Sequence, residues 1–142
     1  CQCSLPGGLK FQYFRLRRLS TVTSFQLPDI VNFDTKKGSY VVGRAAERSD
    51  IVLDSIAKQC MISRHHATFV YSERQSTWTL KDASSMNGCF VDDIKIQERL
   101  LRSWRLLYIH RNGDIIVFGG GANIRAGEKV KQLSSEFRFL YE

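Results

Sequence analysis

The sequence of 142 residues predicts an all-β fold, either a sandwich or a barrel, and three observations favour it. Apolar and polar residues alternate with a period of two in repeated runs of about four to eight residues. Polar segments with Gly, Asn or Ser separate these runs, as turns do. Nine Phe, five Tyr and two Trp residues favour strands, because aromatic side chains fit a pleated surface.

The strand pattern recurs along the whole chain. It covers residues 11–18, 39–43, 50–54, 66–71, 77–82, 89–91, 114–118 and 137–141. The alternation in the first run places Phe14 and Leu16 on one face, and later in the chain it directs Trp78 and Leu80 inward. The polar residues 72–76 separate two of the clearest runs, so we expect a hairpin loop there.

Other segments interrupt this rhythm. Residues 28–37, rich in Asp and Lys, predict a loop. Residues 119–131 are Gly-rich and basic and predict a long, mobile surface loop before the last strand. Residues 97–107 carry apolar side chains at helical spacing, yet a strand fits this stretch about as well. The strongest turn signals are the Asn-Gly pairs at 87–88 and 112–113.

Composition narrows the classes of partner. The formal charge of +7 favours anionic partners, whether phosphopeptide, nucleic acid or membrane surface. No window approaches the roughly 20 apolar residues of a membrane span. Among the anionic partners, a membrane is not expected. The cysteines and histidines lack the paired spacing of a zinc site, so we expect reduced thiols and neither metal nor cofactor. The cysteines are Cys1, Cys3, Cys60 and Cys89.

Short polar motifs stand at the ends of predicted strands, where the loops of a sandwich collect functional residues. They are Gly43-Arg44, Ser63-Arg64-His65-His66 and Asn87-Gly88. Each alone is weak, since Gly43 can ease a strand end, Ser63 and His66 can be turn or core polar groups, and Asn-Gly occurs in many hairpins. Their order, with about twenty residues between successive motifs, makes the set specific within an all-β chain.

This ordered set resembles the forkhead-associated (FHA) domain family from about Phe11 to Tyr141. Further matches carry the resemblance, namely Asp50-Ile-Val-Leu, Leu80-Lys-Asp82 before Ser85-Met-Asn87-Gly88, Val91 with Ile94-Lys-Ile96, and Asn112-Gly-Asp114-Ile-Ile-Val-Phe118-Gly. The resemblance implies a two-sheet β-sandwich of about eleven mainly antiparallel strands, of the FHA/SMAD-like type. It implies a disordered terminal segment over residues 1–10 and one FHA domain over 11–142. It also implies a non-catalytic module that recognises phosphothreonine in partner proteins through loops at one end.

Carried over by position, the resemblance implies a set of binding residues. Arg44 is expected to reach the peptide and its phosphate, Ser63 to donate its hydroxyl to a phosphate oxygen, Arg64 to add a basic phosphate contact, and Asn87 to hydrogen-bond the ligand backbone. The expected supporting residues are Gly43, His66, Ser85 and Gly88. These residue types suit a ligand with a charge of about −1.5 to −2 and three acceptor oxygens.

Met86 departs from the family pattern, because members often carry Thr just before the Asn. Either Ser84 or Ser85 substitutes for that hydroxyl, or Met86 makes an apolar contact instead. The resemblance further implies a preference for phosphothreonine over phosphoserine, through a small pocket for the γ-methyl group. One methyl in such a pocket contributes about 1–3 kcal/mol.

Alternative functions have weaker support. Ser63, His65 and His66 are residue types of a catalytic triad, yet they belong to one local motif and no Gly-x-Ser-x-Gly sequence occurs. The Gly-rich segment lacks the spacing of a P-loop, so no enzyme is predicted. Basic runs at 15–18 and 99–111 favour nucleic acid as a secondary partner at most. A phosphate-independent scaffold is the remaining alternative, and the retained binding residues argue against it. Family habit favours a nuclear location and a role in the DNA damage response, with the cytoplasm as the alternative location.

Overall fold

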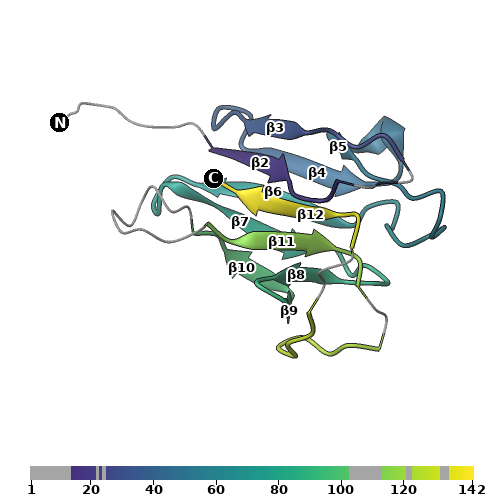
Figure 1. The fold of residues 1–142 in the computed structure, drawn as a ribbon. Helices are drawn as coiled ribbons and strands as arrows, with labels where there is room; N and C mark the ends of the chain where they lie inside the picture. Colours follow the sequence, from purple (N-terminus) through teal and green to yellow (C-terminus); the bar gives the residue numbers. More distant parts are fainter. Residues whose placement is uncertain (1–13, 22, 24, 103–112, 121–122, 132–134) are drawn as a thin grey trace.

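The computed structural model describes residues 14–21, 23, 25–102, 113–120, 123–131 and 135–142. This part of the chain forms eleven strands in two sheets, which pack face to face (Figure 1). The first sheet has the order β10-β7-β6-β4-β5, with bounds β4 (Ser39–Gly43), β5 (Ile51–Val52), β6 (Ala67–Ser72), β7 (Thr77–Asp82) and β10 (Glu98–Leu100). The second has the order β3-β2-β12-β11-β8-β9, with bounds β2 (Phe14–Arg18), β3 (Ile30–Phe33), β8 (Cys89–Val91), β9 (Ile94–Ile96), β11 (Ile115–Phe118) and β12 (Arg138–Tyr141).

Neighbouring strands are antiparallel in every pair except β4 and β5, which are parallel. A short 3-10 helix, η1 (Ala46–Arg48), lies between β4 and β5. The prediction of a two-sheet, mainly antiparallel β-sandwich is therefore confirmed, and the barrel is excluded. The described part of the chain also contains no helix with the length and apolarity needed to cross a membrane.

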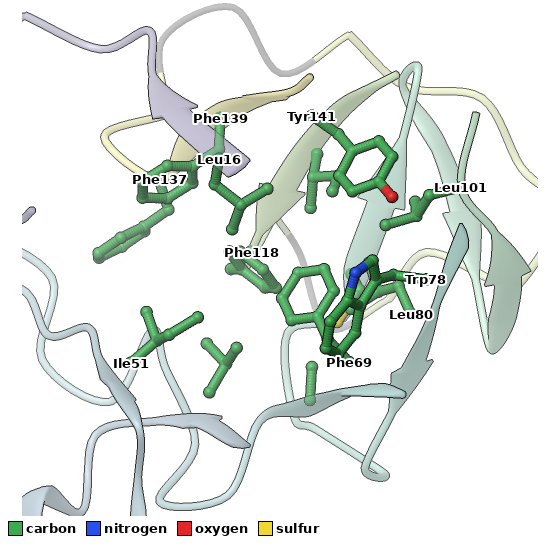
Figure 2. Close-up of a cluster of buried hydrophobic side chains, with 14 of the residues drawn as sticks. Leu16, Ile51, Phe69, Trp78, Leu80, Leu101, Phe118, Phe137, Phe139 and Tyr141 are labelled. Atoms are coloured by element: carbon green, nitrogen blue, oxygen red, sulfur yellow. The ribbon is translucent and has the colours of Figure 1, made fainter. Parts of the chain in front are cut away.

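An aromatic core fills the space between the sheets. Trp78 and Leu80 on β7 are fully buried, as their alternation predicts. The ring of Phe33 lies with its centroid 4.9 Å from that of Phe69 and 4.9 Å from that of Trp78, which joins the two sheets. Figure 2 shows Phe69 and Trp78 facing Phe118 and the C-terminal strand across this core. Tilted rings at such distances add to the stability gained by burial, so the sheets form a firm base for their loops.

The strand register brings several loops to one end of the sandwich. Val42 at the end of β4 lies opposite Ala67 at the start of β6, and Ala67 lies opposite Asp82 at the end of β7. In the other sheet, Cys89 at the start of β8 lies opposite Phe118 at the end of β11. The loops after β4, before β6, between β7 and β8, and after β11 therefore emerge together. We call this the loop end, and the β6–β7 hairpin lies at the opposite end.

The predicted loop over residues 28–37 is wrong at its centre, because Ile30–Phe33 form β3. This strand pairs with β2, and Val31 lies opposite Leu16. The charged residues around a short apolar run hid the strand signal, and tertiary packing decides the outcome, since Phe33 is buried in the aromatic core. A turn does follow at residues 35–37.

Several other expectations concern residues that are only partly described. Within 97–107, Glu98–Leu100 form β10, so the strand interpretation holds for this part. Residues 103–107 lie outside the described residues, as do the expected terminal segment 1–10, the first three residues of the run 11–18, and Asn112 of the second Asn-Gly pair.

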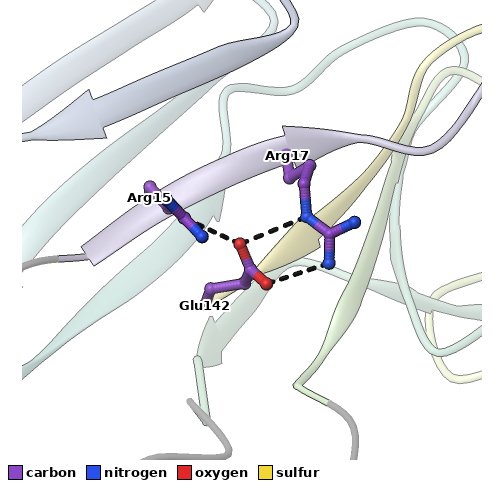
Figure 3. Close-up of polar contacts among 3 residues, drawn as sticks. All are labelled: Arg15, Arg17 and Glu142. Carbon is purple, nitrogen blue, oxygen red and sulfur yellow. Dashed lines mark hydrogen bonds and ion pairs between the residues drawn. The ribbon is translucent and has the colours of Figure 1, made fainter.

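Arginines on β2 are paired with acids. Arg15 donates to Glu142 over 2.8 Å, and Arg17 donates to the same carboxylate over 2.9 Å (Figure 3). The bond from Arg17, followed by that from Arg15, lowers the pKa of the Glu142 carboxyl despite its partial burial. Arg18 pairs with Asp29. These ion pairs neutralise part of the 15–18 run and join β2 to the end of β12, which weakens the case for a nucleic-acid stripe there.

Candidate functional site

Gly43 allows two of the motifs to touch. A Cβ atom at this position would lie 2.0 Å from the carbonyl oxygen of Arg64, closer than any side chain can approach. Beside this contact, the Arg44 amide donates to the Ser63 carbonyl over 3.0 Å, and the Ala45 amide donates to the Arg64 carbonyl over 3.3 Å. The Gly43-Arg44 and Ser63-Arg64 segments therefore run side by side at the loop end.

Cationic side chains of this segment pair lie at the surface. Arg44 is half-buried, and its Nε donates to the Ile62 carbonyl over 3.0 Å. That bond orients the guanidinium and leaves its Nη groups without a hydrogen bond to the described residues. Arg64 is exposed, and its side chain makes no ion pair within the described residues. Two guanidinium groups are thus available to an anion beside the Ser63 backbone.

The Ser63 hydroxyl faces the next loop. Its Oγ accepts a hydrogen bond from the Met86 amide over 3.1 Å. Because the oxygen is the acceptor in this bond, the hydroxyl hydrogen remains to donate to a ligand. Ser63 is half-buried and Met86 is 69% exposed, so this pair lies at the rim of the site. The contact of Met86 with Ser63 is made by its backbone amide, so it is neither the substitute hydroxyl nor the apolar contact expected at this position.

His66 connects the site loops from the protein interior. Its Nδ1 accepts the Ser63 amide over 3.0 Å, and its Nε2 lies 2.7 Å from the Gly88 carbonyl. An amide can only donate and a carbonyl can only accept, so the ring is neutral with its proton on Nε2. Burial lowers the pKa of His66, which agrees with a neutral ring. The side chain has no surface exposure, so its position is structural.

Asn87 fastens the same loops at the surface. Its Nδ2 donates to the Cys60 carbonyl over 3.2 Å and to the Met61 carbonyl over 3.1 Å. These two acceptors fix the orientation of the amide, because the opposite orientation would point Oδ1 at both carbonyls. Its donors are therefore committed to the protein, and Oδ1 is the atom left for a ligand. Asn87 is half-buried.

A small polar network shapes the turn that presents Asn87. The Ser85 hydroxyl donates to Asp82, the Ser85 amide donates to the same carboxylate over 3.2 Å, and the Gly88 amide donates to Ser85 Oγ over 3.0 Å. Gly88 has a φ of 83°, which favours glycine, and Ser84 has a φ of 57°. Ser85 and Gly88 thus support the turn, while the Ser84 side chain is exposed and makes no such contact.

His66, Asp82 and Cys89 bring potential metal ligands within 4.8 Å of one another. Their hydrogen bonds account for the cluster, because both ring nitrogens of His66 have protein partners and the Cys89 thiol donates to Asp82 over 3.2 Å. Burial and the nearby Asp82 carboxylate raise the pKa of Cys89 well above its usual value, so the thiol is protonated. Cysteine binds zinc as a thiolate and histidine binds it through a free nitrogen lone pair, and in this cluster Cys89 and His66 offer neither.

Sequence reasoning missed three residues that contribute to this end of the molecule, namely Gly119, Gly120 and Lys95. The Gly119 amide donates to the Gly88 carbonyl over 2.8 Å, and the Gly120 amide donates to the Asn87 carbonyl over 2.8 Å. The Lys95 side chain passes so close to Gly88 that a Cβ there would lie 2.8 Å from its Cε. No signal in the sequence places Lys95 here, because its position follows from the pairing of Phe90 with Lys95, one pair from the loop end.

The family model for the FHA domain matches residues 40–119, which include all the motif residues described above. The chain therefore belongs to the FHA domain family. Searched against curated protein sequences, the chain has no match.

Solved structures agree on the fold. The FHA domain of the CT664 protein from Chlamydia trachomatis is 22% identical, with a TM-score of 0.59, over 91% of this chain and 95% of that one. The Slr1951 protein from Synechocystis sp. is 24% identical, with a TM-score of 0.54, over 92% and 94%. Mycobacterium tuberculosis EmbR, in complex with a low affinity phosphopeptide, is 20% identical, with a TM-score of 0.55, over 92% of this chain and 24% of that one. At these identities the likeness shows the fold alone.

Proposed function

We propose that this domain binds phosphothreonine in partner proteins and performs no catalysis. The observation that carries the proposal is the meeting of Arg44, Ser63 and Arg64 at one exposed end, beside Asn87. Two guanidinium groups and one hydroxyl offer donors to a dianion, and fixed donors at a surface are what a phosphate recognises. Membership of the FHA family, and the phosphopeptide bound to the related EmbR structure, support this assignment.

Asn87 contributes in two ways under this proposal. Its Nδ2 holds the Cys60–Met61 segment in place, and its Oδ1 accepts a backbone amide of the bound peptide. Reading the peptide backbone next to the phosphorylated residue fixes the direction of the chain without selecting its sequence. Side chains farther along the ligand then provide the selectivity.

Matched peptides test the proposal. One sequence is synthesised with phosphothreonine, phosphoserine or unmodified threonine, and binding is measured by isothermal titration calorimetry. We expect micromolar affinity for the phosphothreonine peptide, at least tenfold weaker binding of the phosphoserine peptide, and none of the plain peptide. Arg44→Ala removes the binding, whereas Arg74→Ala, which deletes an exposed cation in the hairpin at the opposite end, preserves it. Equal affinity for the phosphorylated and plain peptides would refute phosphate recognition.

A further inference from the structure

A segment rich in basic residues lies beside β9, close to the candidate site. We call residues 123–131 the basic strap; it contains Arg125, Lys129 and Lys131 against one acid, Glu128, and residues 125–131 are all exposed. The strap lies along β9, beyond the edge of the six-stranded sheet (Figure 1). There the Gly127 amide donates to the Lys95 carbonyl over 2.7 Å, and the Lys95 amide donates to the Glu128 carbonyl over 2.9 Å.

Lys95 joins the strap to the site. Its Nζ donates to the Ile124 carbonyl over 2.5 Å, and the same ammonium lies 3.4 Å from where a Cβ on Gly88 would stand. Gly88 follows Asn87 directly, and its carbonyl accepts the bond from His66. The strap residue next to Ile124 is Arg125, so a strap cation directly follows the residue that Lys95 contacts.

The cations of Lys95 and the basic strap have no salt-bridge partner within the described residues. One carboxylate oxygen of Glu128 accepts the backbone amide of Arg125 instead of pairing with a cation. Asp92 and Asp93 lie at the β8–β9 turn, away from the loop end. Asp92 accepts the Ile115 amide, and the Asp93 carbonyl accepts the Val130 amide over 2.8 Å, so Asp93 lies beside the far end of the strap.

The distance to the phosphate donors suits one short peptide. The path from Ser63 Oγ through the Met86 amide and Gly88 to Lys95 Nζ gives an upper bound of about 17 Å, taking ~3.8 Å per Cα step. An extended peptide covers that span in about five residues, at ~3.3 Å per residue. A carboxylate within about five residues of the phosphothreonine therefore reaches Lys95, and Arg125 directly follows Ile124, whose carbonyl accepts the Lys95 ammonium.

Resting on the proposed function, we infer that the preferred ligands are phosphothreonine peptides with acidic residues within about five positions of the phosphothreonine, read by Lys95 and the basic strap. A peptide is favoured over nucleic acid because residues 123–131 include no aromatic side chain on which a base could stack. Lys95 also connects the basic strap to the candidate phosphate site, so one linear ligand can occupy both.

Calorimetry with three phosphothreonine peptides tests this inference. One has neutral flanks, one has Asp and Glu before the phosphothreonine, and one has them after it. We expect one acidic peptide to bind about threefold to tenfold tighter than the neutral one at low salt, with the gain shrinking as salt is raised. Arg125→Glu removes or inverts this ratio, and thermal unfolding verifies that the variant is folded. Arg74→Glu, with the same charge change at the opposite end, keeps the ratio.

Other outcomes overturn the inference in recognisable ways. If both acidic peptides bind like the neutral one while phosphorylation is still required, the acidic reading fails and the phosphothreonine site stands. If phosphorylation is not required, the proposed function itself fails. If a short DNA duplex binds tighter than every peptide and Arg125→Glu abolishes that binding with a steep salt dependence, the strap is a nucleic-acid surface instead.

Discussion

Replacing Gly43 with alanine tests the claim that close backbone contact between two loops builds the site. The new Cβ would lie 2.0 Å from the Arg64 carbonyl oxygen, 2.8 Å from its carbonyl carbon and 2.9 Å from Ser49 Oγ. Real contacts start near 3 Å, so the Arg64 backbone has to move by about 1 Å or more. Overpacking of this kind costs about 1–3 kcal/mol of folding free energy.

That movement also disturbs the binding groups. The hydrogen bonds from the Arg44 and Ala45 amides, to the carbonyls of Ser63 and Arg64, lie beside the contact and lengthen with it. We therefore expect Gly43→Ala to lower both the unfolding free energy and the affinity for a phosphothreonine peptide, the latter by tenfold or more. Urea unfolding and calorimetry give the two values.

A matched variant separates stability from binding. Ile116→Val removes one methyl group from a fully buried side chain in the middle of β11 and costs about 0.5–1.5 kcal/mol. It should leave the peptide affinity unchanged, because Ile116 lies two residues before Phe118, the β11 residue whose ring meets His66 with a centroid distance of 6.0 Å. A Gly43→Ala protein with normal stability and normal affinity would refute the reasoning from close contact.

Three further predictions follow from the hydrogen bonds and ion pairs. Asn87→Asp keeps an acceptor but loses the donors to the Cys60 and Met61 carbonyls, so calorimetry should show at least tenfold weaker peptide binding. Wild-type affinity would contradict the claim that these two hydrogen bonds hold the site loops in place. Burial lowers the pKa of His66 in the folded state, so the contribution of a neutral His66 to the unfolding free energy is fully present above the unfolded-state pKa of about 6.5. As pH drops below that value, the unfolding free energy falls by up to about 1.4 kcal/mol per pH unit. A urea midpoint that does not fall between pH 7.5 and 5.5 would contradict this. The pKa of Glu142 is lowered instead, so its stabilising effect is fully present above its unfolded value and is lost as pH falls through the lowered folded value. Glu142→Gln should therefore lower Tm more at pH 7 than at pH 3, and equal losses at both would contradict an ionic role.

Local patterns were sufficient for most strands of this domain. Alternating or short apolar runs identified β2, β4, β5, β6, β7, β8, β11 and β12. Alternation also placed Trp78 and Leu80 in the core, because the side-chain period of a strand is fixed by geometry. β3 was missed because its apolar run is short and its burial depends on Phe33 meeting rings from the other sheet. β10 stayed ambiguous because three residues cannot distinguish a strand from a helix.

For the candidate site, too, the sequence predicted some features and not others. Motif order pointed to Arg44, Ser63 and Asn87, and the structure brings their loops together. The commitment of the Asn87 donors to Cys60 and Met61 was not predictable, because it depends on two loops far apart in the chain. The place of Lys95 depends equally on the pairing of β9 with β8, which no local pattern specifies.

Titration of labelled protein with a phosphothreonine peptide, followed by NMR amide shifts, tests the central claim most directly. We predict that the largest changes occur at Arg44, Ser63–Arg64 and Met86–Gly88, with small changes at the β6–β7 hairpin. Changes centred on the β2–β3 face, or none at the three loops, would contradict a phosphate site at this end of the sandwich.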